Sequence, residues 1–398
     1  MDEQSFMTLY WQDPHRALGH AREHTPVREV TFETGPTWLV TRYADVRAGL
    51  ADPRLAKDYR AALPAEERAA APPGLPAPMS HMLTSLDPPD HTRLRGLVAQ
   101  AFTVRRVAEL RPRVEAIARD LLAGLPSGEP VDLVADYAIP LPMEVICALI
   151  GVPELDREDF AHWSTVLIDE CPEPELIRAS AQLADYLGGL VALRREEPDD
   201  ALLSGLIEAS DGGERLSDLE IVAMAMLLLM AGHETTAVFV TNSVRALLSD
   251  PAARQRLKPD TAPELIEELL RWVSPALNAS LRFATEDLEI GGVAIPRGAS
   301  VTLSTGAANR DPDRFAAPDG LDPDRETAGH VAFGHGIHRC LGAALVRLEA
   351  EVALTALFGR FPDLRAAAAE EELTFRRSVH VHAPRKFPVV LGPPSPGG

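Results

Sequence analysis

Hydrophobic residues recur every three to four positions over much of the chain, which is the spacing of one face of an α-helix. The stretch 107–125 shows this clearly, with apolar side chains at Val107, Leu110, Val114, Ile117, Leu121 and Leu122. Further helices are predicted over Ala135–Ile150, Pro174–Arg195, Ser217–Leu248, Thr261–Trp272 and Leu341–Phe358. The pattern therefore predicts a mainly helical protein.

The helix predicted over Ser217–Leu248 is long enough to cross the whole molecule, because a helix rises about 1.5 Å per residue. Ser217 and Glu220 form a capping box at its start, in which each side chain serves the other residue's free backbone donor. Its most apolar part, Ile221–Gly232, is shorter than the roughly 20 apolar residues that a bilayer requires. We therefore expect a core helix and not a membrane span.

A minor β portion is predicted where β-branched and aromatic residues gather in short runs. A hairpin near the start has Gly35-Pro36 at its turn, and the expected strands are Val27–Phe32, Thr37–Thr41, Leu281–Ala284, Leu288–Ile290, Val301–Ser304, Leu373–Phe375 and Phe387–Leu391. The Ala- and Pro-rich stretch Arg60–Pro78 is predicted to be a loop with short helical pieces, placed where it could cover something. We find no repeat and no long linker, so residues 1–398 are expected to form a single domain, with Pro393–Gly398 as a disordered tail.

The charge balance disfavours nucleic-acid binding as the main function. Lys and Arg total 39 and Asp and Glu total 59, so the net charge is 39 − 59 = −20, which does not suit a nucleic-acid backbone. Three cysteines in 398 residues, Cys147, Cys171 and Cys340, do not make a disulfide framework and fit a reducing compartment. No signal peptide or membrane anchor is evident near Met1, so we expect a soluble cytoplasmic protein.

The run Phe333–Gly342 is the first candidate for chemistry. Its glycines allow tight turns and a close approach to a flat ligand, and Cys340 precedes a predicted helix whose dipole favours a thiolate. A thiolate is a strong ligand for iron. Two other interpretations remain open at this point: a buried structural cysteine, and a zinc site from His335, His338 and Cys340, although that spacing fits no usual zinc finger.

This run resembles the heme-binding loop of cytochrome P450 enzymes, Phe-Gly-x-Gly-x-His-x-Cys-x-Gly, and every fixed position matches. The resemblance implies the cytochrome P450 fold with heme b buried beside the long central helix. It also implies that Cys340 is the iron ligand and that Phe333, Gly334, His338 and Gly342 help to hold the cofactor. The expected activity is that of an O2-dependent monooxygenase.

Glu268-Leu269-Leu270-Arg271 matches the Glu-x-x-Arg motif of the family. Residues three apart share a helix face, and such a pair alone is usually a solvated surface contact. The resemblance implies instead a buried pair that meets Arg325 and pins the loop on the proximal side of the heme. Leu321 stands where many bacterial members have Phe, a small departure from the pattern.

The polar run 231–236, Ala-Gly-His-Glu-Thr-Thr, interrupts the apolar part of the central helix. Buried polar groups are costly unless they have partners or a function. A zinc-protease interpretation fails because position 237 is Ala where a second His is needed. The run is similar to the oxygen-activation motif of the family. By that resemblance Ala231 and Gly232 leave room for dioxygen, Thr235 hydrogen-bonds it, and Glu234 relays protons.

His91 and Arg95 share a helix face after Pro88-Pro89, which without context is as compatible with surface charge as with a site. The resemblance places both on the heme propionates, together with Arg282 and His338. Four polar or cationic donors facing two carboxylates make sensible electrostatics for a buried cofactor.

The implied reaction is hydroxylation or epoxidation of a hydrophobic small molecule. By analogy with actinobacterial relatives, we expect a secondary metabolite such as a polyketide or macrolide, and therefore a role in antibiotic biosynthesis. The expected substrate contacts are Met82, Leu83, Leu228, Ala231, Leu277, Ala279 and Val379.

Electrons are expected from a separate ferredoxin and its reductase, because no Gly-x-Gly-x-x-Gly fingerprint of a fused flavin or nicotinamide domain is present. A basic patch for an acidic ferredoxin would comprise Arg105, Arg106, Arg111, Arg113, Arg339 and Arg347. The alternatives are a non-oxidative protein of the same fold that binds a ligand or recruits a partner, and a peroxide-driven variant. Both are disfavoured because they would be expected to alter the pair Glu234-Thr235, which is intact.

Overall fold

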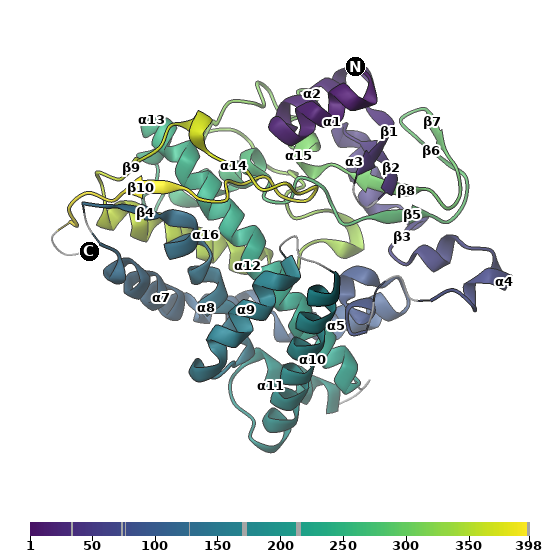
Figure 1. The fold of residues 1–398 in the computed structure, drawn as a ribbon, viewed down its shortest axis with the longest axis horizontal. Helices are drawn as coiled ribbons and strands as arrows, with labels where there is room; N and C mark the ends of the chain where they lie inside the picture. Colours follow the sequence, from purple (N-terminus) through teal and green to yellow (C-terminus); the bar gives the residue numbers. More distant parts are fainter. Residues whose placement is uncertain are drawn as a thin grey trace.

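The computed structural model describes residues 1–32, 35–72, 75, 77–126, 128–168, 173–211 and 216–395. Figure 1 shows a helical region that holds most of the mass and a smaller region where short strands lie beside the N-terminal helices. The predicted class, mainly α with a minor β portion, is confirmed.

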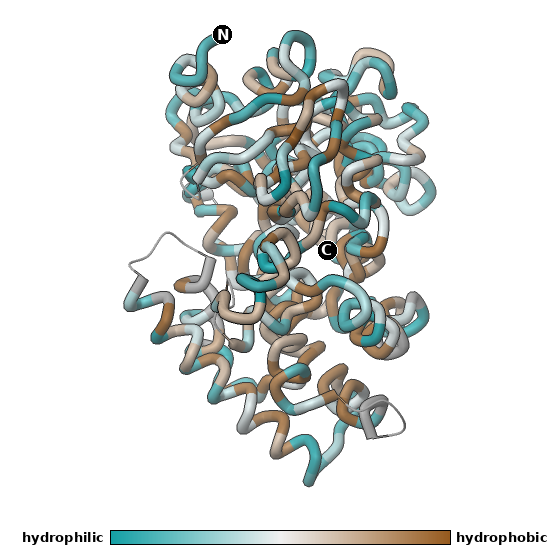
Figure 2. Tube along the Cα trace, turned by 90° about the vertical axis from the view of Figure 1, so that its right-hand side faces the viewer, coloured by the Kyte–Doolittle hydropathy of each residue, from teal (hydrophilic) through white to brown (hydrophobic). Residues whose placement is uncertain are grey.

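Most of the helical region is built from long helices of the middle and end of the chain. They are α5 (Asp90–Ala101), α6 (Val104–Glu109), α7 (Arg111–Gly124), α8 (Pro140–Ile150), α9 (Arg157–Ile168), α10 (Glu173–Glu196), α11 (Leu202–Asp211), α12 (Asp218–Ser249), α14 (Ala262–Val273) and α16 (Ala343–Arg360). Hydrophobic and hydrophilic positions alternate along these helices in Figure 2. This alternation is what packing one helix face against a core requires.

Helix α12 is the predicted central helix, and its start is confirmed. The Ser217 amide donates to the Glu220 carboxylate at 2.8 Å, and the Glu220 amide donates to the Ser217 hydroxyl at 3.3 Å. The helix packs on α8, α10 and α16. Among the described residues α12 is long and apolar enough to cross a membrane, but most of its apolar part is buried within the protein. It is therefore the core helix that the sequence predicts.

The β portion has one larger sheet, in the order β1 (Val27–Phe32), β2 (Gly35–Val40), β8 (Ser300–Leu303), β5 (Arg282–Ala284) and β3 (Leu55–Ala56). The predicted hairpin is confirmed, with Val27 opposite Val40, but Gly35-Pro36, expected at its turn, belongs to β2 and pairs with Phe32 and Thr31. Strand β2 then runs parallel to β8, which connects the start of the chain to its last third. This sheet thus brings the N-terminal segment close to residues that follow α14.

Two smaller sheets complete the β portion. Strands β6 (Leu288–Ile290) and β7 (Val293–Ile295) form a hairpin, and β4 (Pro130–Asp132), β10 (Pro388–Val390) and β9 (Arg365–Ala366) form a three-stranded sheet. The predicted strand Leu373–Phe375 is wrong, because Phe375 makes only an isolated bridge with Pro384 and no ladder continues from it.

Two N-terminal helices were missed by the sequence prediction: α1 (Glu3–Gln12) and α2 (Pro14–His24). Asp2 caps α1 by accepting from the Ser5 amide, and Asp13 caps α2 by accepting from the Arg16 amide. Both helices pack on the hairpin β1–β2 through a small separate core that includes Phe6, Tyr10, Leu18, Val30, Phe32 and Leu39.

The stretch Arg60–Pro78 contains the short helical pieces that were predicted, within η1 (Tyr59–Ala62) and at α4 (Ala65–Arg68). Pro73, Gly74 and Pro76 lie outside the described residues, and so do Cys171 and the last part of the predicted disordered tail, 396–398. Ser395, within that tail, is described, and its amide donates to the Arg360 carbonyl at 2.8 Å.

Candidate active site

A cavity of about 330 Å³ lies where α5, α12 and the start of α16 meet the loop before α16. Its walls bring together residues from distant parts of the chain. The lining includes Arg95, Ala231, Gly232, Thr235, Arg282, Phe333, Gly334, His338, Cys340 and Gly342, all of them predicted site residues. None of the described residues of Arg60–Pro78 lines it.

The loop that carries Cys340 is shaped by glycines in a left-handed backbone conformation. Gly334 has φ of 70° and Gly336 has φ of 75°, values that side chains with a Cβ rarely adopt. A Cβ on Gly336 would lie 2.8 Å from the Leu50 carbonyl oxygen, so no side chain fits there. The Cys340 amide donates to the Phe333 carbonyl at 2.8 Å, which closes the loop and aims the sulfur at the cavity.

The Cys340 thiol is free, and this exposed residue lines the cavity. Burial raises its pKa, whereas the Gly342 amide and the Arg95 and Arg339 guanidinium groups act in the opposite direction. Helix α16 begins at Ala343, two residues later than predicted. In the protein alone, burial outweighs the helix terminus and neighbouring cations, so the thiol is protonated. A bound metal ion deprotonates such a thiol outright.

A cluster of basic side chains lies at one end of the cavity. His338 and Arg282 line it, and the His91 ring lies 4.2 Å from the His338 ring, measured between centroids. Arg95 also lines the cavity and donates to the Arg339 carbonyl. The structure thus brings the four predicted propionate-binding residues together.

Lys57 belongs to the same cluster, and sequence reasoning missed it. Its ammonium group donates to the Ser280 carbonyl at 2.8 Å, and its side chain lines the cavity beside Arg282. Burial, followed by the Arg282 charge, lowers the pKa of Lys57 to about 7. A lone Lys after a short strand carries no sequence signal for a site, so only the fold reveals it.

The basic cluster has unsatisfied donors, which indicates that it binds an anion. Neither ring nitrogen of His91 has a hydrogen-bond partner, nor has Nε of Arg282, among the described residues. Burial first, then the charges of Lys57 and its neighbours, lower the pKa of His338 to about 2. Buried donors without acceptors cost about 1–3 kcal/mol each. A ligand with two carboxylates, such as heme with its propionates, supplies the missing acceptors and charge.

On α12, Ala231, Gly232 and Thr235 face the cavity. A Cβ on Gly232 would lie 2.6 Å from Cδ1 of Ile146, so this glycine also lets α12 pack closely on α8. The Thr235 hydroxyl donates to the Ala231 carbonyl at 2.9 Å, within its own helix. A hydroxyl therefore stands at the cavity wall opposite the loop of Cys340.

Glu234 does not line this cavity. Its carboxylate pairs with the Arg376 guanidinium at 2.8 Å, beside a separate small cavity of about 70 Å³ that His233 and Thr241 also line. Glu234 and Thr235 thus point from neighbouring positions of α12 into different cavities. This arrangement suits proton transfer in which Glu234 exchanges protons with solvent on one side of α12 and Thr235 presents its hydroxyl to the larger cavity on the other side.

The Glu268–Arg271 pair is completely buried at the end of α14. Arg271 binds the carboxylate through two nitrogens, each at 2.7 Å, and Arg325 adds a third contact at 3.1 Å. The Asp322 amide also donates to Glu268, at 3.0 Å. A bidentate pair with further hydrogen bonds offsets the desolvation of these charges. The network holds the irregular segment that leads to the loop of Cys340.

A buried carboxyl group that sequence reasoning missed is Glu349 of α16, which lines the cavity edge. Burial raises its pKa well above the ordinary value, so it is protonated. Its nearest hydrogen-bond partner is the Thr236 hydroxyl at 3.5 Å. The Glu residue follows Cys340 by nine positions within a helix, and its helical position alone did not single it out.

The expected substrate contacts fall into two groups with respect to the cavity. Leu83, Leu228, Ala231 and Ala279 line the cavity, but Met82, Leu277 and Val379 do not. Met82 packs into the main core, Leu277 packs over Gly306, and Val379 packs against the N-terminal core. Consecutive residues in an irregular segment point in different directions, so membership of a segment does not fix exposure to the cavity. Residues missed by the prediction include Thr84, Met224, Leu227, Pro275, Asn278 and Thr305.

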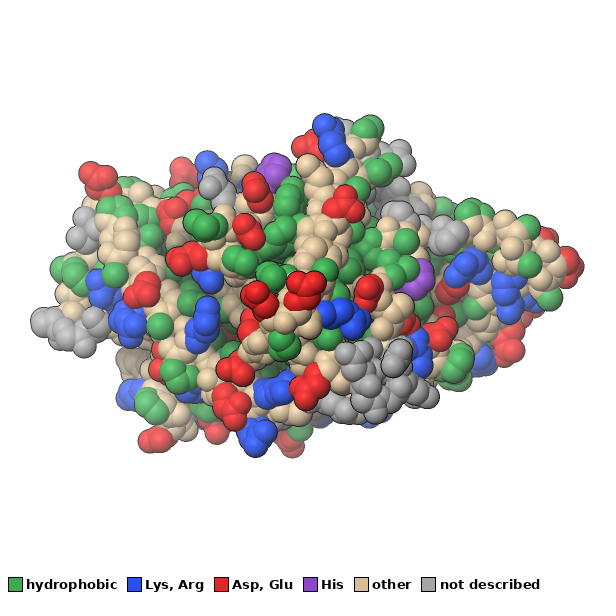
Figure 3. All heavy atoms as spheres, turned by 90° about the horizontal axis from the view of Figure 1, so that it is seen from below, with side chains coloured by type: hydrophobic (Ala, Val, Ile, Leu, Met, Phe, Trp, Pro, Cys, Tyr) green, Lys and Arg blue, Asp and Glu red, His purple; other side chains and the backbone are tan. Residues whose placement is uncertain are grey.

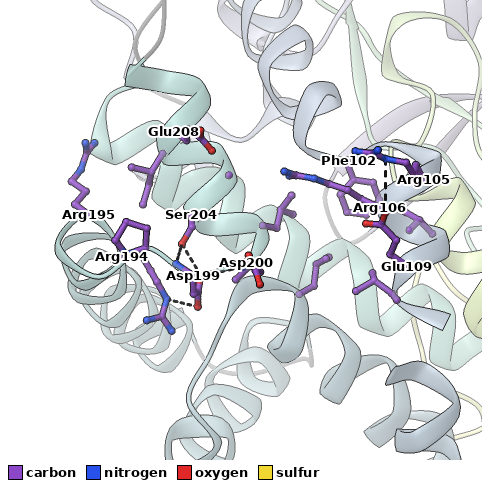
Figure 4. A pocket seen from close by; sticks show the side chains of 18 residues that line it. Phe102, Arg105, Arg106, Glu109, Arg194, Arg195, Asp199, Asp200, Ser204 and Glu208 are labelled. Atoms are coloured by element: carbon purple, nitrogen blue, oxygen red, sulfur yellow. Dashed lines mark hydrogen bonds and ion pairs between the residues drawn. The ribbon is translucent and has the colours of Figure 1, made fainter. Parts of the chain in front are cut away.

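A larger cavity, of about 960 Å³, lies between α6 and the segment joining α10 to α11 (Figure 4). Its charged side chains pair with one another: Arg194 contacts Asp199 at 3.0 Å and Arg105 contacts Glu109 at 3.8 Å. Phe102 borders both cavities. The larger cavity contains none of the predicted heme or oxygen-activation residues, so it is not the active site.

The zinc interpretation of the Cys340 loop receives no support. Within the part of the chain that the structure describes, no three His, Cys, Asp or Glu side chains are arranged to hold a metal ion. One cysteine thiol facing the cavity, with a basic cluster at one end, fits heme instead.

Comparison with known proteins agrees with this geometry. The cytochrome P450 family model matches residues 173–262 and 261–385. The chain is 49% identical to the vitamin D(3) 25-hydroxylase of Pseudonocardia autotrophica, over 98% of this chain and 96% of that protein. It is 42% identical to the 6-deoxyerythronolide B hydroxylase of Saccharopolyspora erythraea, over 95% of this chain and 96% of that protein.

Solved structures give the same result. The ligand-free P450 monooxygenase TamI superposes with a TM-score of 0.87 and 40% sequence identity, over 98% of this chain and 93% of that chain. A loop aiming one cysteine into a cavity beside a long central helix, in a fold shared with these enzymes, defines a heme-thiolate protein. The chain belongs to the cytochrome P450 family. It is a monooxygenase whose cofactor is heme b.

Proposed function

We propose that this monooxygenase hydroxylates or epoxidises a bulky hydrophobic secondary metabolite, such as a polyketide or macrolide, in antibiotic biosynthesis. The observation that supports this most directly is the lining of the cavity between α12 and the Cys340 loop. Apart from the basic end and a few hydroxyl and amide groups, it is apolar, with Leu83, Met224, Leu227, Leu228, Ala279 and Pro275. An apolar chamber favours a large, weakly polar ligand.

The names of relatives point in the same direction. One is a mycinamicin IV hydroxylase/epoxidase from Micromonospora griseorubida, 41% identical over 94% of this chain and 94% of that protein. The vitamin D(3) 25-hydroxylase acts on a different hydrophobic molecule, as its name states. We therefore infer the chemical class of the substrate from the cavity and the oxidation type from the relatives.

We propose distinct roles for the site residues. Cys340 binds the heme iron, and the basic cluster with Lys57 neutralises the propionates. The bound heme supplies the centre at which dioxygen is reduced and cleaved, a cleavage that thiolate donation favours. Thr235 holds a hydroxyl hydrogen-bond donor at the cavity wall, and Glu234 passes protons from the solvent side of α12. Leu83, Leu228 and Ala279 exclude water from the reacting face.

Electrons are proposed to come from a ferredoxin reduced by its reductase. The proposed docking patch comprises Arg105, Arg106, Arg111, Arg113, Arg339 and Arg347. Part of its charge is already neutralised, because Arg111 pairs with Glu351 at 3.0 Å and Arg347 pairs with Glu267. Arg339 forms no ion pair with any described residue, so it is the strongest candidate to meet an acidic partner.

We also propose that the chain is a single cytoplasmic domain. The largest core cluster contains residues from Met82 to Leu391, so most of the described chain shares one hydrophobic core. The two described cysteines, Cys147 and Cys340, are free thiols, as a reducing compartment favours.

The test of the proposed reaction is isotopic. The heme-loaded protein is incubated with a panel of macrolides and polyketides, a ferredoxin, its reductase, a nicotinamide reductant and ¹⁸O₂. We expect one product to gain a single ¹⁸O atom, with the other atom released as water. A product that forms without label from ¹⁸O₂, or that forms only when hydrogen peroxide is added, would contradict the proposal.

A further inference from the structure

We propose that Tyr10, on the first helix of the chain, is a positioning residue that sets the shape of the substrate-facing wall of the cavity through Asn278. The inference rests on the proposed function, since it takes the cavity to be the chamber of heme and substrate. Tyr10 itself does not line the cavity, and Asn278 does. The coupling therefore runs from a helix outside the site to a wall within it.

Three groups form a closed set of hydrogen bonds. Nδ2 of Asn278 donates to the Tyr10 hydroxyl at 2.9 Å and to the Val379 carbonyl at 2.6 Å. The Tyr10 hydroxyl in turn donates to the same carbonyl at 3.2 Å. A carbonyl only accepts, so this set fixes which end of the Asn278 amide faces Tyr10. Tyr10 and Asn278 are both almost completely buried, with 1% and 2% of their surfaces exposed.

The segment that Asn278 belongs to is one wall of the cavity. Its lining residues are Pro275, Ala276, Asn278, Ala279 and Ser280. The segment leaves α14 through Ser274, whose φ of 45° is left-handed, and it is irregular up to β5. A backbone hydrogen bond also holds the segment, since the Leu277 amide donates to the His380 carbonyl at 2.7 Å. The side chain of Asn278 is the point where this wall is connected to the N-terminal helices.

The other end of the connection is rigid. The Tyr10 ring contacts the rings of Trp11 and Phe32, each at 5.3 Å between centroids, and Phe6 at 6.0 Å. The opposite end of the Asn278 amide, Oδ1, has no partner among the described residues. Without the Tyr10 hydroxyl the amide keeps one bond, to the Val379 carbonyl, and can turn about it. The Asn278 side chain can then adopt other orientations within the wall.

The arrangement also explains why Val379 does not contact the cavity although it was expected to. Its side chain packs in the N-terminal core, and its carbonyl oxygen holds Asn278. The segment around Val379 therefore acts on the substrate wall indirectly, through its backbone.

The experiment compares Tyr10→Phe with Tyr137→Phe in the heme-loaded protein. Tyr137 is the matched control, because it is also buried and its hydroxyl also donates to a carbonyl, that of Ala353, at 2.9 Å. Soret titrations give the Kd of two probes that ligate heme iron: imidazole, which is too small to reach the wall, and clotrimazole, which fills the chamber. We expect Tyr10→Phe to change the Kd of clotrimazole by about threefold to tenfold, the effect of one hydrogen bond, and to leave that of imidazole unchanged.

A second pair of variants tests whether the effect of Tyr10 on the cavity depends on Asn278. Tyr10→Phe in an Asn278→Ala background is expected to have no further effect on the Kd of clotrimazole, because both changes break the same contact. The proposal is overturned if the two effects add, if Tyr137→Phe changes the Kd of clotrimazole equally, or if Tyr10→Phe leaves that Kd unchanged. Failure of the proposed function is distinguishable, because the ¹⁸O₂ incubation of the wild-type protein tests that function independently of the Kd of clotrimazole.

Discussion

At the scale of single residues, the cavity has two chemically different ends. One end gathers the basic side chains of Lys57, Arg95, Arg282 and His338, and the loop of Cys340 supplies one thiol. Burial removes hydration from these groups and so lowers the pKa values of Lys57, His338 and Arg282, and neighbouring cations lower those of Lys57 and His338 further. An anionic cofactor reverses that penalty. Burying these basic side chains therefore lowers the stability of the cofactor-free protein, and binding of the anionic heme offsets this loss.

The lowered pKa of Lys57 predicts that the free energy of unfolding of the cofactor-free protein depends on pH. Because the folded protein holds the pKa of Lys57 at about 7, below its ordinary 10.5, the unfolded chain binds more protons between these values. This group then makes the free energy of unfolding rise with pH, by about 2 kcal/mol between pH 7 and pH 9. Lys57→Met is expected to flatten the rise. Urea unfolding of apo wild type and variant at pH 7 and pH 9 measures it, and equal slopes for the two proteins would refute the assignment.

The ion pair of Glu234 and Arg376 predicts a second effect. Arg376→Gln removes the contact at 2.8 Å that holds the carboxylate at the small outer cavity. We expect proton delivery to the active site to become slower. The yield of hydrogen peroxide per electron pair consumed should therefore rise several-fold. The control is Arg377→Gln, whose guanidinium lies over the Trp11 ring at 4.7 Å. An unchanged peroxide yield in Arg376→Gln would exclude this role.

At the scale of elements, helix α12 separates the two cavities and α14 anchors the loop of Cys340. The capping box at Ser217 fixes where α12 starts, and Gly232 fixes how closely it approaches α8. Helix α14 carries Glu268 and Arg271, whose side chains reach the irregular segment around Asp322. The position of the thiol therefore depends on charges that lie well away from it.

That dependence can be tested with two variants of the same helix. Glu268→Gln leaves Arg271 and Arg325 buried without a counter-charge, and breaking a buried ion pair in this way costs about 3–5 kcal/mol. Glu264→Gln, at an exposed position in the first turn of α14, should cost less than about 0.5 kcal/mol. Urea unfolding measures both. Similar losses in the two variants would show that the network is not what anchors the loop.

At the scale of the whole molecule, the face drawn in Figure 3 has acidic and basic side chains interspersed, not gathered by sign. A net charge of −20 must therefore be offset locally if an acidic ferredoxin is to dock. Arg339 is the candidate for this role, since it immediately precedes Cys340 in the loop that carries the thiol. Its neighbours Arg111 and Arg347 are already paired with Glu351 and Glu267.

We expect Arg339→Glu to slow reduction by a ferredoxin about tenfold at low ionic strength, and less at high salt, because screening weakens the attraction. Arg16→Glu, at an exposed position on the N-terminal helix α2, is the control for net charge. Stopped-flow reduction rates at two salt concentrations measure the effect. Equal rates for the two variants would contradict the proposed docking patch.

How much of this could be predicted from sequence depends on the range of the interactions. Helical periodicity and the Ser217 capping box are local, so α12 was predicted with its start. The loop of Cys340 was also predicted, because its glycines and cysteine lie within ten residues. Lys57 and Tyr10 were missed, since their partners are more than 200 residues away in the chain. The position of Leu277 outside the cavity lining has the same origin, because the direction of its side chain is set by tertiary packing.

The most direct test of the account is the bond between heme iron and the sulfur of Cys340. Cys340→Ala and Cys147→Ala, the latter a buried cysteine of α8, are loaded with heme, reduced and exposed to carbon monoxide. We predict that Cys147→Ala keeps the wild-type carbon monoxide difference spectrum and that Cys340→Ala loses the thiolate-ligated Soret band. A heme-loaded Cys340→Ala protein with a spectrum like that of the wild type would contradict the central claim.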